Sequence, residues 1–147
     1  MTATRESQAA VALIRHPAGE KFLCQWSTTW KALHFIGGHR DGTESFRECA
    51  VREVREELGL AEGTFGVAAE PLARLDYVAF SESAKVPTRY VMEVFPARLR
   101  IELDERPENA WLGWDEIARG QADDGRRISP TVGFILGKIG ISPLATG

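Results

Sequence analysis

Alternating and clustered apolar residues divide the chain into short strands. The predicted strands span residues 10–14, 21–26, 33–36, 72–80, 89–103 and 111–114. The first two flank the turn signal Pro17-Ala18-Gly19, so we predict that they form a hairpin. Pro96 interrupts the fifth, which favours an edge position or a bulge because proline cannot donate a backbone hydrogen bond.

A four-residue repeat of apolar positions predicts the longest helix. The repeat consists of Phe46, Ala50, Val54 and Leu58, which form one stripe along a helix. Ser45 can cap the N-terminus, with Glu48 three residues on completing a capping box. Gly59 follows the stripe, where a left-handed residue commonly ends a helix.

Two further helices are expected near the C-terminus. Asp115 can cap a brief helix at 116–119, which Gly120 ends, and Ser129-Pro130 starts a last helix that continues to Ile139. Strands mixed with helices indicate an α+β protein in which helices cover both faces of a mixed sheet. We expect a single domain over residues 1–147, with a frayed terminus at 1–8.

Composition narrows the function classes. The chain has 147 residues, 44% of them apolar and 27% charged, and a net charge of −3, which fits one globular domain. The charge argues against a polymeric nucleic-acid partner. Without an apolar window of about 18 residues or an apolar leader, we expect neither membrane insertion nor secretion. Cys24 and Cys49 match no disulfide or zinc pattern; we read both as small apolar fillers in a cytoplasmic protein.

Acidic residues concentrate on one side of the longest predicted helix. At about 100° per residue, Glu53, Glu56 and Glu57 occupy a wedge of about 100° that overlaps the apolar stripe, with Arg52 beside it. Such like charges cost a helix about 0.2–0.5 kcal/mol per pair. A hard divalent cation would stabilise them, and Mg²⁺ suits a site with a few carboxylates. Taken alone, the cluster favours a solvated acidic face with ordinary ion pairs.

The complete pattern resembles the signature of the Nudix hydrolase family, G-x5-E-x7-R-E-U-x-E-E-x-G-U, where U is aliphatic. The matching residues are Gly38, Glu44, Arg52, Glu53, Val54, Glu56, Glu57, Gly59 and Leu60. With each residue type at about 7% usage, the seven fixed letters would coincide by chance about once in 10^8 positions. The resemblance implies the family's α/β/α sandwich and its hydrolysis of nucleoside diphosphates linked to another moiety.

The resemblance also implies a role for each matched residue. The acids Glu53, Glu56 and Glu57 correspond to ligands of Mg²⁺ or Mn²⁺, and the carbonyl of Gly38 to a further ligand. Glu44 corresponds to the acid at the start of the helix, and Arg52 to the residue that orients the catalytic glutamates. Which glutamate activates the water differs among family members and stays open here.

Substrate contacts are less determined than metal contacts. His39 and Arg40 follow the glycine turn near the expected phosphates, although a solvent-facing loop is the competing reading. Trp30 is the best candidate for stacking a base; the others are Trp26, Phe35 and Tyr90. Some family members place an extra acid in the region of Glu102, Glu105 and Glu108. We read His16 and His34 as structural, and we expect Trp111 and Trp114 to pack between the last strand and the last helix.

The primary functional prediction is therefore a Mg²⁺-dependent enzyme that hydrolyses a pyrophosphate bond in a nucleotide sugar, a dinucleoside polyphosphate or a similar small nucleotide. One alternative is a nucleoside triphosphate pyrophosphohydrolase that removes damaged nucleotides. Another is a module that keeps the fold and senses a nucleotide without cutting it. The pattern permits a homodimer but leaves open the nucleobase, the leaving group and the number of metal ions.

Overall fold

The computed structural model describes residues 5–141. Its strands are β1 (Arg5–Ile14), β2 (Lys21–Ser27), β3 (Ala32–His39), β4 (Phe65–Val67), β5 (Ala73–Ser81), β6 (Val86–Leu99) and β7 (Asn109–Gly113). Its helices are α1 (Phe46–Leu58), α2 (Trp114–Arg119) and α3 (Pro130–Lys138). The described strands follow the order β4-β6-β1-β3-β2-β7, and β5 pairs with β6. β1 and β6 run parallel, whereas the other pairs are antiparallel, so the sheet is mixed.

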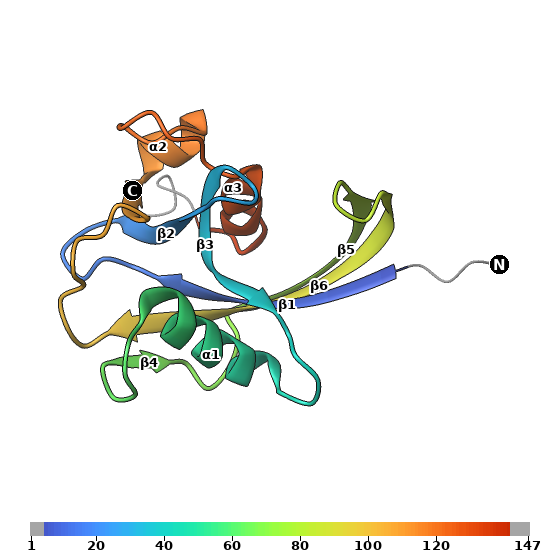
Figure 1. Ribbon diagram of the computed structural model, residues 1–147, viewed down its shortest axis with the longest axis horizontal. Coiled ribbons are helices and arrows are strands. Elements are labelled where there is room, and N and C mark those ends of the chain that lie inside the picture. The colour runs from blue at the N-terminus through green and yellow to red at the C-terminus, as the bar shows by residue number, and fades with distance from the viewer. Residues whose placement is uncertain (1–4, 142–147) are drawn as a thin grey trace.

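Helices cover both faces of this sheet (Figure 1). Successive strand residues point to opposite faces, and β1 shows both sides. Ala10, Ala12 and Ile14 lie in a buried cluster with Ala50, Val54 and Leu58 of α1. The intervening Val11 and Leu13 lie in a second cluster, with Val132, Ile135 and Leu136 of α3 and with residues of α2 packed against it. The predicted α/β/α sandwich is therefore confirmed.

The predicted hairpin between the first two strands is wrong, because β3 lies between them. The first half of β3 pairs with β2, from Ala32 with Ser27 to Phe35 with Cys24. Its second half pairs with β1, from Ile36 with Ala12 to His39 with Ala9. Just after β1 the chain meets β2 at an isolated bridge between Arg15 and Phe22, beside a hydrogen bond from the His16 N–H to the Lys21 carbonyl at 2.9 Å. β3 has eight residues, so it is long enough to pair with both neighbours. The predicted strand at 33–36 was too short to indicate this.

The N-terminal region is more regular than predicted. Residues 5–8 belong to β1, which pairs in parallel with β6 from Arg5 opposite Thr88 onward. The Arg5 guanidinium donates to the Thr88 hydroxyl at 3.2 Å, and Ser7 is buried. Long-range pairing thus overrides the local polarity that suggested fraying. Residues 1–4 of the predicted frayed segment lie outside the described residues.

Pro96 lies within β6, which is not an edge strand. On one side, β5 pairs with β6 as far as Val94, and β4 takes over at Ala97. Pro96 therefore falls where the antiparallel partner changes, so its missing N–H interrupts neither register. β4 was not predicted; at three residues it is too short to show a period.

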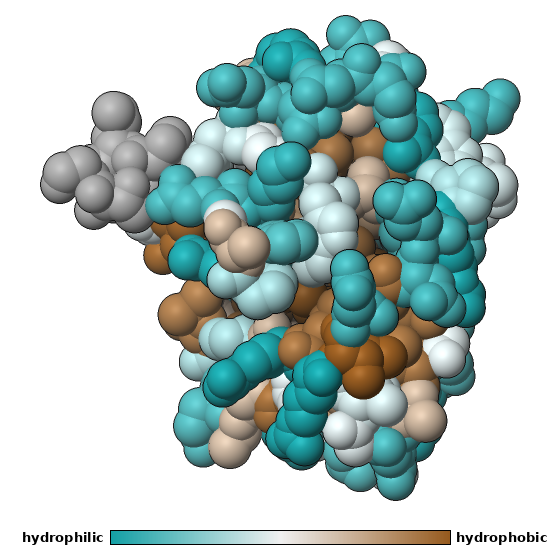
Figure 2. Space-filling view, turned by 90° about the vertical axis from the view of Figure 1, so that its left-hand side faces the viewer, coloured by the Kyte–Doolittle hydropathy of each residue, from teal (hydrophilic) through white to brown (hydrophobic). Residues whose placement is uncertain are grey.

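The connection between β6 and β7 leads from the end of β6 around the left side of Figure 1. The same side faces the viewer in Figure 2, where hydrophobic side chains lie between polar ones. At the opposite side of Figure 1, β5, β6 and the start of β1 extend beyond the helices. Among residues 5–141 no helix has the length and apolar character needed to span a bilayer.

The ends of α1 are confirmed. The backbone N–H of Glu48 donates to the Ser45 hydroxyl at 3.0 Å, and the Ser45 N–H donates to the Glu48 carboxylate at 2.8 Å. Gly59 has a φ of 65° and ends the helix in the left-handed conformation. α3 also starts as predicted, with Ser129 as cap and Pro130 first. These local signals fix where the acidic residues of α1 lie along the chain.

The predicted cap of α2 is wrong. The Gly113 N–H donates to the Glu116 carboxylate at 3.0 Å, so the helix begins at Trp114 and Asp115 lies inside it. Gly120, with a φ of 74°, ends α2 as predicted.

Replacing the cap of α1 tests its contribution. We expect Ser45→Ala to lower the free energy of unfolding by about 1 kcal/mol, because an orphan N–H of the first turn loses its acceptor. Urea denaturation followed by circular dichroism measures the change. Glu48→Gln is the matched control, since glutamine preserves the capping box. An unchanged free energy of unfolding for Ser45→Ala would show that the cap contributes nothing.

Candidate active site

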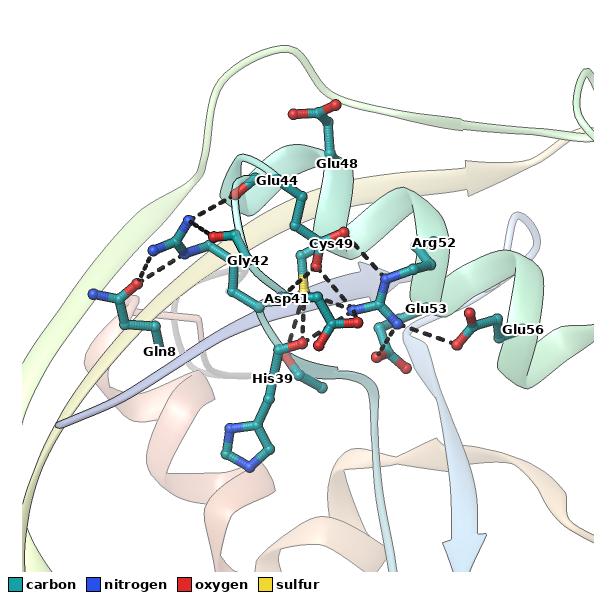
Figure 3. A network of polar contacts seen from close by, with 12 residues as sticks. Gln8, His39, Asp41, Gly42, Glu44, Glu48, Cys49, Arg52, Glu53 and Glu56 are labelled. Atoms are coloured by element: carbon teal, nitrogen blue, oxygen red, sulfur yellow. Dashed lines mark hydrogen bonds and ion pairs between the residues drawn. The ribbon is translucent and has the colours of Figure 1, made fainter. Parts of the chain in front are cut away.

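Arg52 forms the centre of a polar network that joins α1 to the loop after β3 (Figure 3). Its guanidinium donates to Glu53 at 3.0 Å and to Glu56 at 3.1 Å, both on α1. It also donates to the Glu44 carboxylate at 2.9 and 3.1 Å and to the His39 carbonyl at 3.0 Å. Arg52 therefore orients two of the three acids, which is the position that the sequence predicted for it.

Glu44 holds Arg52 in place. Besides its two hydrogen bonds from Arg52, the carboxylate accepts the Asp41 N–H at 2.7 Å. The hydrogen bonds from Arg52 are the main cause that lowers the pKa of Glu44 to about 2. The surrounding carboxylates in turn raise the pKa of Arg52. Glu44 thus stays ionised at any ordinary pH. Glu44 therefore positions Arg52, and Arg52 in turn contacts Glu53.

The glycine turn at the end of β3 lies directly against Glu53. A Cβ on Gly38 would come within 2.5 Å of a Glu53 carboxylate oxygen, and a Cβ on Gly37 within 2.3 Å of the Ala10 carbonyl oxygen. Real Cβ atoms do not approach other atoms so closely. Gly37 therefore requires glycine, because the clash is with backbone, whereas a side chain at Gly38 would push the Glu53 carboxylate from its place. The side chain of Glu53 is only 13% exposed. The turn therefore brings backbone atoms and a carboxylate together.

Glu57 carries the most perturbed acid of the site. Burial is the main cause that raises the pKa of its carboxyl to about 9, and the neighbouring Glu53 adds to the effect. The Glu57 Oε2 atom is buried and has no hydrogen-bond partner among the described residues. The raised pKa keeps the Glu57 carboxyl protonated at neutral pH, and its Oε2 atom is left without a hydrogen-bond partner.

The three acids of the motif do not all converge. Across residues 5–141, no three Asp, Glu, His or Cys side chains are close enough to form a preformed metal site. Glu53 and Glu57 are neighbours, whereas Glu56 pairs with Arg52 one turn away. With its side chain 60% exposed, Glu56 has room to rotate. The predicted three-acid cluster is thus present in part.

Cys49 contacts the same turn from inside. Its thiol is completely buried and donates to the carbonyls of Gly38 and His39, both at 3.4 Å. Burial, followed by the nearby charge of Glu44, raises the pKa of Cys49 to about 11, so the thiol stays neutral. Burial also raises the pKa of Cys24, which packs in the core on the α3 side. Cys24 is a filler as predicted, and Cys49 is in addition a hydrogen-bond donor.

Arg40 and His39, predicted as substrate contacts, are partly engaged within the protein. Arg40 donates to the Gln8 side chain and, at 2.8 Å, to the Glu44 carbonyl, and it lies over the Phe46 ring. These contacts close the loop between β3 and α1. His39 contacts the Ser7 hydroxyl through Nδ1 at 3.2 Å and lines a cavity beside the turn.

That cavity has a volume of about 400 Å³ and connects the glycine turn to Trp30. Gly37 and Gly38 line one end, and Met92, Val132 and Ile135 supply an apolar wall. Trp30 is 54% exposed, and its carbonyl accepts a hydrogen bond from Arg127 at 3.1 Å. The volume falls within the range of small-ligand pockets. Of the predicted substrate contacts, Trp30 and His39 thus share one cavity, and Arg40 does not line it.

A sequence model of the NUDIX domain matches residues 5–132. The chain belongs to the Nudix family. The match includes the whole Gly38–Leu60 motif, and it confirms the expected enzyme class, a Nudix-type pyrophosphohydrolase. A search of curated proteins found no match.

Solved structures share the Nudix fold. The MutT protein from Methanosarcina mazei Go1 is 17% identical, with a TM-score of 0.65 over 95% of this chain and 96% of that protein. A NUDIX hydrolase from Nitrosomonas europaea is 19% identical, with a TM-score of 0.60 over 90% and 87%. The C. elegans Ap4A hydrolase is 14% identical, with a TM-score of 0.54 over 80% and 86%. Identities this low establish the fold alone.

Sequence reasoning missed two residues beside the Nudix helix. The Gln25 side chain, on β2, donates to the Glu57 carbonyl at 2.8 Å and to the Asn109 side chain at 2.9 Å. It therefore links the end of α1 to β7. A polar residue inside the apolar run FLCQW was the available signal for Gln25. No signal identified Asn109, 84 residues away in the chain.

The remaining candidates of the Nudix domain divide between structure and surface. Trp26 packs on the core and Tyr90 stacks on Tyr77, whereas Phe35 is buried and also lines the cavity beside the turn. Trp114 packs on the α3 side as expected, whereas Trp111 packs on the α1 side, edge-on to His16. His16 is structural as predicted; His34, which bonds the Phe35 carbonyl through Nδ1, also lines the cavity beside the turn.

The possible extra acids of the Nudix site lie outside α1. Glu102 and Glu105 are exposed, and the carbonyl of Glu108 accepts the Trp26 N–H at 2.7 Å. None of their carboxylates contacts Glu53 or Glu57 in the described residues, so their assignment as a ligand or base stays a prediction.

The raised pKa of Glu57 predicts how metal-free stability depends on pH. Between about pH 4.5 and 9 the folded protein holds a proton that the unfolded chain has lost, so stability falls as pH rises through this window. Glutamine cannot ionise. We therefore expect Glu57→Gln to stabilise the protein against urea in EDTA, more at pH 8 than at pH 5. Glu62→Gln, at an exposed position, is the control. An equal gain at both pH values would contradict the assignment.

Proposed function

We propose that this chain hydrolyses a pyrophosphate bond in a nucleoside diphosphate linked to a second group, with Mg²⁺ or Mn²⁺ as cofactor. The observation that carries the proposal is the Glu53–Glu57 pair. The Glu53 carboxylate lies against Gly38, and the Oε2 atom of the neighbouring Glu57 is buried and has no hydrogen-bond partner among the described residues. Such a pair costs free energy unless a proton or a cation separates the charges.

The residues fit a divalent cation. All the proposed donors are oxygen atoms, from Glu53, Glu56, Glu57 and the Gly38 carbonyl, and oxygen donors with open positions suit Mg²⁺. A cation at Glu57 would replace the proton that the buried carboxyl now holds, so affinity should rise with pH. Glu56 would have to leave Arg52, which its exposure permits.

Hydrolysis requires an activated water and a leaving phosphate. When bound, the cation supplies positive charge to the phosphate oxygens and makes a coordinated water more acidic. A carboxylate of the set accepts the proton of the attacking water, provided that it lies within hydrogen-bond reach. The water oxygen forms the new bond to phosphorus, the bridging P–O bond breaks, and the leaving phosphate takes the bond's electrons. Arg52 keeps Glu53 oriented throughout.

The cavity beside the turn supports a nucleotide as the substrate. Its apolar wall and the exposed Trp30 suit a planar base, and base–aromatic stacking is worth about 1–3 kcal/mol in single-strand binders. Because Gly38 lines the cavity and contacts Glu53, a nucleoside placed there would have its phosphates at the acids. His39 lies at the same end, as expected for a phosphate contact.

Loss of either buried carboxylate should abolish turnover. We expect Glu53→Gln and Glu57→Gln to lower kcat at least 100-fold with Mg²⁺, because neither amide can carry the negative charge that holds the cation. Products from nucleoside triphosphates, dinucleoside polyphosphates and nucleotide sugars are read by phosphorus NMR, and circular dichroism checks the fold. Glu62→Gln is the matched control and should retain full activity.

The outcomes separate the alternatives. Near-normal turnover by Glu57→Gln would refute its role. Release of pyrophosphate from triphosphates alone would indicate the house-cleaning activity, whereas a nucleoside monophosphate plus a second phosphorylated product supports the main proposal. Tight nucleotide binding without any Mg²⁺-dependent product would identify a sensing module instead.

A further inference from the structure

The tryptophan that would stack on a base stands on a loop with a defined backbone. Residues 28–31 connect β2 to β3 (Figure 1). The Trp30 N–H donates to the Ser27 hydroxyl at 3.1 Å, and the Lys31 N–H donates to the Ser27 carbonyl at 2.8 Å. Lys31 has a φ of 51°, a left-handed conformation that residues other than glycine rarely adopt. Because such a conformation costs free energy, it persists only where surrounding contacts fix the backbone.

A contact from outside the loop sets where the loop lies. The hydrogen bonds to Ser27 fix the shape of the turn, but they cannot place it against the rest of the molecule. The Arg127 guanidinium does so, because it donates to the Trp30 carbonyl at 3.1 Å although 97 positions separate the two residues. Among the described residues, this is the hydrogen bond that joins residues 28–31 to a segment other than β2 and β3.

The backbone that carries Arg127 is also fixed. The Leu33 N–H donates to the Arg127 carbonyl at 2.8 Å, and the Ser129 N–H donates to the Leu33 carbonyl at 2.8 Å. Between these two contacts, Ile128 forms a parallel bridge with Leu33 and is only 3% exposed. Residues 127–129 therefore lie alongside the start of β3, and the Arg127 side chain reaches Trp30 from a defined origin.

Arg127 and Trp30 share the cavity beside the glycine turn. At 54% exposure, the Trp30 ring has little packing of its own, so its place depends on the backbone that carries it. A side chain that is already in place before a ligand arrives loses less conformational freedom when the ligand binds. The hydrogen bond from Arg127 therefore prepares the ring for a planar ligand.

We propose that Arg127 is a positioning residue for nucleoside binding, because its hydrogen bond to the Trp30 carbonyl holds the indole where a base can stack on it. The proposal rests on the proposed function and adds one residue to its substrate site. Since Arg127 acts through Trp30, its loss weakens nucleoside binding without slowing the chemical step at the acids of α1. Its effect also disappears once the Trp30 ring is removed.

A double-mutant cycle in equilibrium binding tests this coupling. AMP, GMP, CMP and UMP are titrated by calorimetry, and the tightest binder is then used for every variant. We expect Trp30→Ala to weaken binding by about tenfold or more and Arg127→Met by about fivefold or more, because methionine keeps an apolar stem but has no donor. The double variant should bind within about twofold of Trp30→Ala.

The neighbouring arginine provides a matched control. Arg126 also donates to a backbone carbonyl of another connection, that of Pro107, at 2.6 Å. Arg126→Met should therefore bind the nucleotide like wild type. Arg127→Lys keeps one donor and should recover most of the affinity that Arg127→Met loses. Circular dichroism checks that every variant folds.

Steady-state kinetics on the compound that wild type hydrolyses fastest give a second readout. We expect Arg127→Met to raise KM by about fivefold or more and to leave kcat within about twofold, because the interaction lost is a binding one. A lower kcat with an unchanged KM would overturn the positioning role.

The binding cycle separates this role from the others. A full loss of affinity on adding Arg127→Met to Trp30→Ala would overturn the proposal, because the guanidinium would then act independently of the ring. Unchanged binding by Arg127→Met, or no binding of any monophosphate by wild type, would also overturn it. An intact cycle in a protein that hydrolyses no compound would support the role of Arg127 and reject the proposed function.

Discussion

The site depends on one guanidinium that is shared among too many carboxylates. Arg52 lies within salt-bridge distance of Asp41, Glu44, Glu53 and Glu56 and is itself only 20% exposed. One positive charge therefore faces four acids, and Glu57 adds a fifth carboxyl beside Glu53. Partial burial strengthens the pairs with Glu44 and Glu53, whereas solvent screens those with Asp41 and Glu56. The network fixes the geometry of the loop and helix, but it leaves an excess of negative charge that a divalent cation would neutralise.

Local features of this site could be read from the sequence because they depend on neighbours within one helical turn. The cap at Ser45, the end at Gly59 and the apolar stripe all follow from such spacing, and the structure confirms them. The ion pair of Arg52 with Glu56 also follows from their four-residue spacing, whereas the contact of Arg52 with Glu44, eight residues away across the helix start, does not. The motif marks a glycine at position 38, and the contacts that an added Cβ would make with Ala10 at position 37 and with Glu53 at position 38 give the physical reason for the glycine turn.

Features that depend on distant segments could not be read in this way. The pairing of β1 with β3 and β6 joins residues more than 20 apart, so polar residues 5–8 gave no sign of their strand. Arg40 meets Gln8, and Gln25 meets Asn109, through the same long-range pairing. The direction of Glu56 was ambiguous for another reason. A spacing of four residues from Arg52 favours an ion pair as much as convergence with Glu53 and Glu57.

The acids and the groups that would select a substrate stand on different kinds of backbone. Glu53, Glu56 and Glu57 share one helix, whereas Trp30 belongs to the connection between β2 and β3. Connections accept substitutions and insertions with little effect on the core, and regular elements do not. Descendants of this chain could therefore acquire new specificities by exchanging a surface segment while the hydrolytic apparatus remains constant.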